Sequence, residues 1–195
     1  MMAMSHSLDP SSPLITEAYR EMQRKLHENP QYGVASLAYA PIVAEVIGRL
    51  RTGELLDAVE LLDYGAGKGH LGEALKQHIQ TPLEVHHYDP AVMAWSKPPE
   101  PCSLVACIDV LEHIEPDLLD NVLDDLKRVT LQYGVFTVHT QPAMKVLPDG
   151  RNAHLIQQPP HWWLPKLTER FELVVFNRLP DGFWVLVERK PSRGR

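Results

Sequence analysis

The sequence predicts a single α/β domain with a mostly parallel central sheet and an antiparallel hairpin at its C-terminal end. Three observations predict this fold class. Apolar segments of strand length alternate with segments of helical periodicity from residue 59 onward. A glycine-rich turn at residues 65–69 follows the first of these strands, and a Pro-Asp-Gly turn at 180–182 separates the last two. A chain of 195 residues can bury the core that such a domain needs.

Two helices precede the alternating region. Ser12 is a suitable N-cap and Pro13 a suitable first-turn residue for a helix over 12–27. Pro41 can begin a second helix, which extends to residue 51 and carries one apolar face. These helices form an N-terminal cap on the domain.

The remaining elements follow from the spacing of apolar residues, which repeats every two residues in strands and every 3.6 residues in helices. Strands are expected at 59–64, 83–88, 104–108, 135–139, 171–177 and 183–189, and helices at 71–79, 116–129 and 160–170. The single domain then covers 12–190, with the helical cap at 12–52, a disordered N-terminus at 1–11 and a loose basic tail at 191–195.

The composition excludes several classes of protein. A net charge of −6 argues against a broad nucleic-acid surface, which is usually basic. No apolar run of about 18 residues could span a membrane, and the first residues lack the pattern of a signal peptide. Cys102 and Cys107 are expected on opposite faces of one buried strand, as core thiols in a reducing cytoplasm. We therefore expect a cytoplasmic protein.

The most informative motif is the glycine-rich segment at 61–72, Leu-Leu-Asp-Tyr-Gly-Ala-Gly-Lys-Gly-His-Leu-Gly. Its glycines allow a tight strand-to-helix turn and close approach of a ligand to the backbone. A dinucleotide fingerprint would need glycine where His70 stands, and a phosphate loop would need Ser or Thr directly after Lys68. The pattern Asp-x-Gly-x-Gly-x-Gly is complete, from Asp63 to Gly69.

This pattern resembles the first motif of the class I S-adenosylmethionine-dependent methyltransferases, and the resemblance extends over about residues 55–190. It implies a Rossmann-like fold with S-adenosylmethionine as cofactor, the glycine loop wrapping its methionine part. Asp89, at the end of the second strand, stands where the family binds the ribose hydroxyls. The cofactor-binding residues implied in this way are Asp63, Gly65, Ala66, Gly67, Gly69, Asp89, Pro90, Asp109 and Val110.

Residues 106–114, Ala-Cys-Ile-Asp-Val-Leu-Glu-His-Ile, are similar to the fourth-strand motif of small-molecule and ubiquinone-pathway O-methyltransferases. One departure from the family lies between residues 90 and 103, where 14 residues replace a helix, a strand and an adenine-binding loop. Pro98, Pro99 and Pro101 oppose regular structure there. We therefore expect a sheet shortened around its third strand. Val92, Met93 and Trp95 can pack either on adenine or in the core.

Methyl transfer from a sulfonium mainly requires alignment, and a base helps when the acceptor is a hydroxyl. His113, His139 and His154 are candidate bases near the carboxyl ends of the strands, and we assign the catalytic role to His113 and His154. His161, Trp162 and Trp163 can line an apolar substrate pocket or pack in the core. Residues 27–39 can form a lid over the cofactor.

A divalent metal is the alternative use of the same residues. Asp109, Glu112, His113 and His154 resemble the metal ligands of some ubiquinone-pathway O-methyltransferases and small-RNA terminal 2′-O-methyltransferases, which usually have Glu where Asp109 stands. We expect a metal-free pocket, with the metal site as the open alternative. The function expected is O-methylation of a small-molecule acceptor, without nucleic acid or membrane. The alternatives are a terminal 2′-O-methyltransferase for RNA and a non-catalytic S-adenosylmethionine-binding regulatory module.

Overall fold

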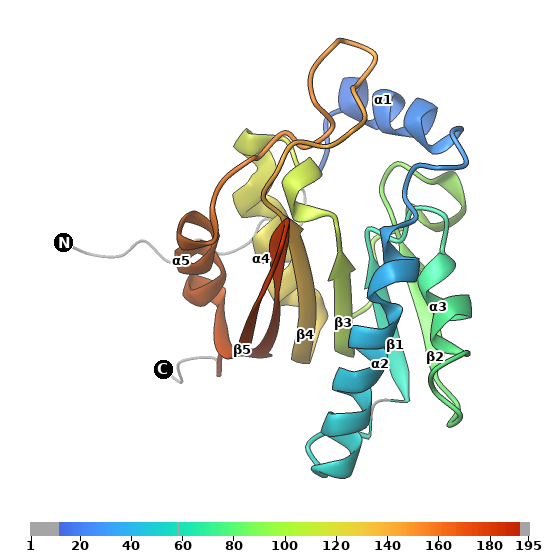
Figure 1. Cartoon of the computed structure of the whole chain (residues 1–195), viewed down its shortest axis with the longest axis vertical. Helices are drawn as coiled ribbons and strands as arrows, with labels where there is room; N and C mark the ends of the chain where they lie inside the picture. Colours follow the sequence, from blue (N-terminus) through green and yellow to red (C-terminus); the bar gives the residue numbers. More distant parts are fainter. Residues whose placement is uncertain (1–11, 58, 192–195) are drawn as a thin grey trace, which may run out of the picture.

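The computed structural model describes residues 12–57 and 59–191. The expected disordered N-terminus and the last four residues of the expected tail lie outside these ranges. The described chain folds into a mixed sheet with helices on both faces (Figure 1). The expected α/β fold class is therefore confirmed.

Within the described residues, six strands form one sheet in the order β2-β1-β3-β4-β6-β5. Their bounds are β1 (Glu60–Tyr64), β2 (Glu84–Tyr88), β3 (Cys102–Ile108), β4 (Thr130–His139), β5 (Phe171–Leu179) and β6 (Gly182–Arg189). Strands β2, β1, β3 and β4 are parallel, whereas β6 pairs antiparallel with both β4 and β5. The antiparallel C-terminal hairpin is thus confirmed.

The sheet is shortened at its β2 edge, as expected. Only the short 3₁₀ helix η1 (Met93–Trp95) interrupts the connection from β2 to β3, and no described strand pairs with the outer edge of β2. The proline-rich stretch after η1 explains why no further strand forms there, since proline has no N–H to donate to a ladder.

Two core clusters cover the two faces of the sheet. Helices α2 (Ala35–Thr52) and α3 (His70–Leu75) pack on one face, and α4 (Leu119–Val129) and α5 (Pro160–Arg170) pack on the other. The strands supply alternate residues to the two clusters, as the pleat requires. Leu104 and Ala106 face α2, whereas Val105 faces α4.

Several element boundaries differ from the predicted ones. Helix α1 (Glu17–His27) begins after Thr16, whose hydroxyl accepts from the Tyr19 amide, so Thr16 and not Ser12 is the N-cap. Helix α2 begins six residues before Pro41 and includes this proline. The hydrogen bond lost at Pro41 is offset by burial of Ala40 and Val43 on the apolar face of the same helix.

Helix α3 ends at Leu75, earlier than predicted, and β4 begins at Thr130, five residues earlier than predicted. The prediction for the cysteines was also wrong. Cys102 and Cys107 belong to the same core cluster. Cys102 is the first residue of β3 and pairs with Thr130 before the register shift of the β3–β4 ladder, and the alternation between faces that holds from Leu104 to Cys107 does not extend to it.

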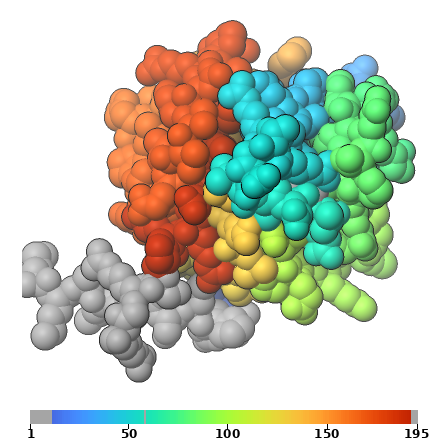
Figure 2. Space-filling view, turned by 90° about the horizontal axis from the view of Figure 1, so that it is seen from below, coloured from blue at the N-terminus to red at the C-terminus, as the bar shows by residue number. Residues whose placement is uncertain are grey.

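The parallel strands point their carboxyl ends at one end of the molecule, where α1 and the 140–159 loop lie across them (Figure 1). The opposite end, seen in Figure 2, shows the end of α2 between the C-terminal hairpin and the region around α3. Among the described helices, none combines the length and the apolar character needed to cross a bilayer.

Candidate active site

The glycine loop after β1 is shaped by backbone that only glycine adopts easily. Gly65, Gly67 and Gly69 have φ values of 79°, 51° and 71°. A Cβ atom on Gly65 would lie 2.4 Å from a methyl carbon of Val110, so this loop and the turn after β3 are in direct contact. The amides of Gly65 and Ala66 both donate to the Tyr88 carbonyl, which ties the loop to the end of β2.

Asp89 holds the loop from the other side. Its carboxylate accepts from the Gly67 amide at 2.9 Å and from the Ala91 amide at 2.8 Å, and the residue is buried. A carboxylate oxygen has more than one acceptor position, so both oxygens can still accept from a ligand. This geometry fits the expected contact with a pair of ribose hydroxyls.

Asp63 lies beneath the loop and is almost fully buried. Burial raises the pKa of this carboxyl, and His87, whose Nδ1 is 3.4 Å from Asp63 Oδ2, opposes the rise. Neither of these two atoms has a hydrogen-bond partner among the described residues. One oxygen of this buried acid is therefore left without a hydrogen bond in the described part of the chain.

Trp95 does not pack toward the cavity. Its indole N–H donates to the Gly67 carbonyl at 3.2 Å, and its ring lies against His87. Met93 is exposed, and neither it nor Val92 lines the cavity. The short connection after β2 thus supports the glycine loop from outside, and these three side chains do not form an adenine pocket.

A cavity of about 390 Å³ lies between the glycine loop, α1 and the 140–159 loop. The expected cofactor residues that line it are Asp63, Gly65, Ala66, Gly67, Asp89, Pro90, Asp109 and Val110. Gly69 does not line it; its amide donates to the Ala66 carbonyl within the turn. The expected cofactor residues are thus brought together, with Gly69 shaping the loop.

Helix α1 forms a wall of the cavity that was not predicted, apart from His27 in the expected lid at 27–39. Tyr19, Gln23 and His27 line the cavity from this helix. Their spacing of four residues places them on one helical face, a signal that was available in the sequence. Gln23 donates to the Tyr19 hydroxyl, and the Tyr19 hydroxyl donates to the His113 carbonyl at 2.5 Å. Helix α1 is therefore joined to the turn that carries His113.

The turn after β3 presents Asp109 and His113. Asp109 has φ of 58°, a left-handed conformation that Asp tolerates better than most residues, and its amide donates to the Thr137 hydroxyl. The short 3₁₀ helix η2 (Leu111–His113) then brings His113 Nε2 to 4.0 Å from Asp109 Oδ2. His113 Nδ1 donates to the Ala153 carbonyl at 2.8 Å, because a carbonyl oxygen can only accept.

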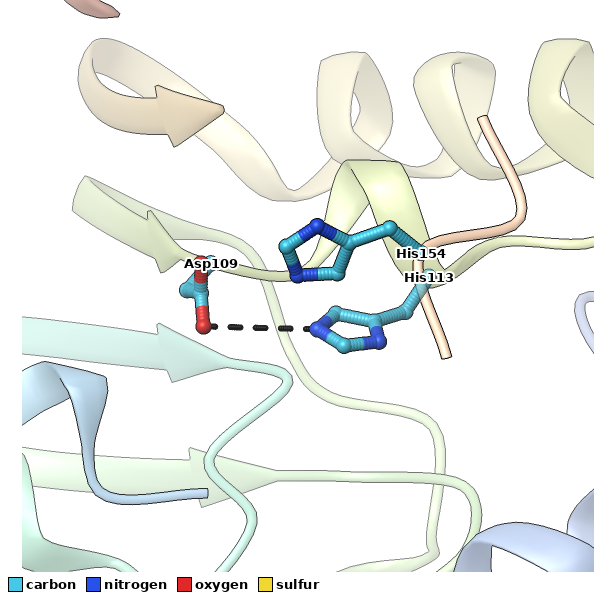
Figure 3. Close-up of side chains that lie close together, drawn as sticks. All are labelled: Asp109, His113 and His154. Carbon is cyan, nitrogen blue, oxygen red and sulfur yellow. Dashed lines mark ion pairs between the residues drawn. The ribbon is translucent and has the colours of Figure 1, made fainter. Parts of the chain in front are cut away.

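His154 approaches the same point from the 140–159 loop (Figure 3). Its Nδ1 donates to the Gln141 carbonyl at 2.6 Å, and its ring lies 4.7 Å from that of His113, measured between centroids. Burial lowers the pKa of His154. Asn152 closes the loop below it, since its side chain accepts from the Ala143 amide and donates to the Ala143 carbonyl.

The ligand atoms of Asp109, His113 and His154 all lie within 4.8 Å of one another. Glu112, the fourth metal candidate, is elsewhere: it is fully buried, does not line the cavity, and accepts from the His139 amide. Burial and the Asp109 charge raise the pKa of Glu112. Although burial alone would raise the pKa of Asp109, the nearby His113 imidazole lowers it to about 2.

The other aromatic candidates divide between the cavity and the core. His139 lines the cavity beside His154, with the ring centroids 5.5 Å apart. Trp163 is fully buried in the core, and Trp162 packs against it and under Lys166. Neither tryptophan lines the cavity, so the His161-Trp-Trp segment does not form the pocket wall.

Several solved structures of similar fold are methyltransferases. A 1,6-didemethyltoxoflavin-N1-methyltransferase from Burkholderia thailandensis, with S-adenosylhomocysteine bound, matches with TM-score 0.60, 15% identity, and coverage of 95% of this chain and 99% of that chain. The N-methyltransferase NodS from Bradyrhizobium japonicum matches with TM-score 0.57 and 14% identity, over 89% of this chain and 99% of that chain. Magnesium protoporphyrin IX methyltransferase from Synechocystis matches with TM-score 0.54 and 15% identity, over 89% of this chain and 95% of that chain. No curated protein matches the chain in sequence.

A parallel sheet with a glycine loop after its first strand, an acid after its second and an antiparallel final hairpin defines a class I S-adenosylmethionine-dependent methyltransferase. Residues 16–177 match the family described as a methyltransferase domain, and the chain belongs to this family. It is thus an enzyme with S-adenosylmethionine as cofactor, which excludes the alternative of a purely regulatory module.

Proposed function

We propose that this methyltransferase transfers the methyl group to an oxygen atom of a small molecule, with His113 and His154 acting on the acceptor. One observation carries the proposal. Both imidazoles donate Nδ1–H to backbone carbonyls, of Ala153 and Gln141, so each neutral ring keeps a bare Nε2. Two bare nitrogens and the Asp109 carboxylate then face one region of the cavity.

The glycine loop and Asp89 fit the cofactor. Side chains at Gly65 and Gly67 would meet Val110 and His27, so only glycine leaves the backbone open at these positions. Asp89 is buried, lines the cavity and can accept from the ribose hydroxyls while it holds the Gly67 amide. When bound, S-adenosylmethionine supplies an activated methyl group on a sulfonium sulfur.

The protein side of the chemistry is alignment and proton acceptance. An acceptor hydroxyl placed among the three side chains would donate its hydrogen bond to one Nε2 atom, which orients an oxygen lone pair toward the cofactor. The lowered pKa of His154 keeps its Nε2 unprotonated, and therefore able to accept, near neutral pH. Asp109, with its lowered pKa, stays ionised and stabilises positive charge on His113.

A divalent cation is the second candidate for the same three residues. Carbonyl groups that accept from Nδ1–H are a common outer shell of metal-binding histidines, because they fix the tautomer and orient Nε2. Two imidazoles and one carboxylate would suit Zn²⁺, Mn²⁺ or Fe²⁺ better than Mg²⁺. The ligand atoms already lie within 4.8 Å of one another.

A small acceptor is favoured over RNA. The cavity of about 390 Å³ is bordered by α1 and the 140–159 loop, and its volume must hold cofactor and acceptor together. The formal net charge of −6 also disfavours a phosphate backbone as partner. Among proteins of similar fold, the didemethyltoxoflavin and magnesium protoporphyrin IX methyltransferases are named for small molecules.

The experiment compares His113→Ala and His154→Ala with His161→Ala, an exposed histidine outside the cavity. Release of S-adenosylhomocysteine is followed with a panel of phenols, catechols and hydroxy acids and with short RNA. We expect both site variants, but not His161→Ala, to lose most activity on a hydroxyl acceptor. Full activity in both site variants, or activity on RNA alone, would contradict the proposal.

Chelator treatment separates the two roles. A base is indifferent to chelator, and its loss is partly offset at high pH, where the acceptor ionises by itself. A metal site loses activity in chelator and regains it with one particular ion. Cobalt absorption spectra provide a readout independent of activity, since ligation by His113 and His154 would give bands that both alanine variants lose.

A further inference from the structure

Lys68 has contacts that methyl transfer does not require. It lies inside the glycine loop, yet its ammonium group points to the N-terminal region and donates to the carbonyls of Asn29, at 2.5 Å, and Tyr32, at 2.7 Å. These two residues belong to residues 28–34, the segment between α1 and α2, which we call the cover segment. A single side chain thus joins the cover segment to the loop expected to bind the cofactor.

The bonding of Lys68 has a clear physical reason. Carbonyls beyond the C-terminal end of a helix lack intrahelical partners, and cations there interact favourably with the helix dipole. Asn29 lies two residues after the end of α1, and its carbonyl also accepts from the Tyr32 amide. Without Lys68, the Asn29 carbonyl would keep its bond from the Tyr32 amide, but both bonds from the glycine loop to this turn would be lost.

The cover segment lies over the cavity, next to the glycine loop at its start and next to the acceptor side through Tyr32. His27, the last residue of α1 directly before the segment, lies so close to Gly67 that a Cβ atom there would be 3.0 Å from its ring, and the Gly33 carbonyl of the segment would be 4.0 Å from the same atom. On the acceptor side, the Tyr32 hydroxyl donates to Gln23 Oε1 at 2.8 Å, and Gln23 donates to Tyr19, which bonds the His113 carbonyl. Tyr32 and Gly33 line the cavity between these points.

We infer that Lys68 is a positioning residue that fastens the cover segment over the cofactor, so that cofactor binding and closure of this segment are coupled. The coupling runs through one short stretch of backbone. Gly67, whose amide Asp89 holds, is the residue directly before Lys68. A ligand that fixes the backbone of Gly67 therefore also fixes the position from which Lys68 reaches Asn29 and Tyr32.

The inference rests on the proposed cofactor position at Gly67 and Asp89, but it does not depend on the acceptor. The test therefore uses S-adenosylhomocysteine alone. We expect Lys68→Met, which keeps the length of the side chain and removes the charge, to raise its Kd about tenfold. Lys68→Arg, which can still donate to both carbonyls, should recover most of the affinity. Lys76→Met is the matched control, since Lys76 is the exposed C-cap residue of α3 and forms an ion pair with Glu73.

Proteolysis measures the cover segment directly. Chymotrypsin cleavage after Tyr32, identified by the mass of the fragments, should slow when S-adenosylhomocysteine binds the wild-type protein. In Lys68→Met the protection should be lost even at saturating ligand. This comparison distinguishes a fastened cover from a general loss of stability, which the thermal midpoint measures separately.

Three results would overturn the inference. One is wild-type affinity and protection in Lys68→Met. Another is a loss of affinity equal to that of Lys76→Met. The third is that cleavage of the wild-type protein after Tyr32 does not slow when S-adenosylhomocysteine binds. This measurement needs no variant, so it tests the inference even if Lys68→Met does not fold. Failure to find a hydroxyl acceptor would refute the proposed function but leave these measurements valid.

Discussion

The half of the cavity that we propose binds the cofactor and the half that we propose binds the acceptor, called the cofactor half and the acceptor half below, are built in different ways. On the cofactor side the backbone carries the shape: three glycines with positive φ, amides bonded to the Tyr88 carbonyl, and one carboxylate, Asp89, that holds the loop. On the acceptor side the shape comes from titratable side chains, those of Asp109, His113 and His154, which arrive from two separate segments.

Because of this difference, the two halves should tolerate different amino-acid substitutions. Backbone that only glycine adopts cannot be altered without strain, so the cofactor half is sensitive to any added side chain. Side chains held by carbonyls of a loop keep their direction only while the loop keeps its conformation. The cofactor half should therefore respond to substitutions in stability and affinity together, and the acceptor half mainly in activity.

The largest expected effect is that of Gly65→Ala. The left-handed φ of 79° and a Cβ only 2.4 Å from a Val110 methyl carbon should together destabilise the protein by about 2–5 kcal/mol. Urea unfolding measures the loss. Gly150→Ala is the control, because Gly150 has φ of 89° but no atom within 4 Å of the added Cβ. An equal loss of unfolding free energy in the two variants would mean that backbone strain alone, and not the contact between Gly65 and Val110, makes Gly65 intolerant of a side chain.

Asp89→Ala should have the next largest effect. It removes acceptors for the Gly67 and Ala91 amides and for the ribose hydroxyls, so the affinity for S-adenosylhomocysteine should fall by on the order of 1–3 kcal/mol. Calorimetry measures this, with the exposed acid Asp117→Ala as control. Unchanged affinity in a folded Asp89→Ala protein would remove this residue from the site.

Asp63→Asn should show a pH-dependent gain in stability. Burial raises the pKa of Asp63, so its contribution to folding is fully present below its ordinary value of 3.8 and is lost as the pH rises toward the folded value. Asn does not ionise, so the variant should be more stable than wild type by about 1 kcal/mol or more at pH 7. The difference should vanish near pH 3–4, and the thermal midpoint against pH measures it.

The control for that experiment is Asp117→Asn, an exposed acid for which no such gain is expected. If Asp63→Asn were less stable than wild type at pH 7, then the His87 contact would outweigh burial. The cofactor half would in that case be held by an ion pair as well as by backbone.

The smallest effect is expected for Met144→Ser on the acceptor side. Met144 is fully exposed but lines the cavity, so the change should leave the thermal midpoint and the affinity for S-adenosylhomocysteine unchanged. A change confined to the KM of the acceptor would assign Met144 to acceptor binding. A change in cofactor affinity would instead break the division between the two halves.

The sequence predicted the parts of the site that short motifs encode. The glycine loop, Asp89 and the Asp109 to His113 turn were all predicted to lie at the carboxyl ends of strands, and each does. The mostly parallel sheet with its antiparallel hairpin followed from the same alternation, and the shortened β2 edge followed from three prolines, whereas the order of the strands was not predicted.

The orientation of the two imidazoles and of Lys68 could not be predicted, because it depends on hydrogen bonds to backbone carbonyls. The carbonyls of Gln141 and Ala153 fix the two imidazoles, but any residue type could supply a carbonyl at these positions. The bond from Lys68 to Asn29 likewise joins residues 39 apart through backbone oxygen. In contrast, the spacing of Tyr19, Gln23 and His27 was visible in the sequence, and its polar and aromatic character indicated a face without a core role.

The closed shape of the 140–159 loop has a consequence for how such an enzyme could acquire new acceptors. Asn152 bonds both the amide and the carbonyl of Ala143, and Val146 bridges to Asn152, so residues 143–152 form a small closed unit. His154 follows this unit: its ring donates to the Gln141 carbonyl, just before the unit, and its amide donates to Asn152 Oδ1. The residues between Lys145 and Asn152 can therefore be exchanged or lengthened by insertion while the histidine keeps its direction, provided that Asn152 is kept. This part of the loop is a suitable position for grafting segments that bind other acceptors.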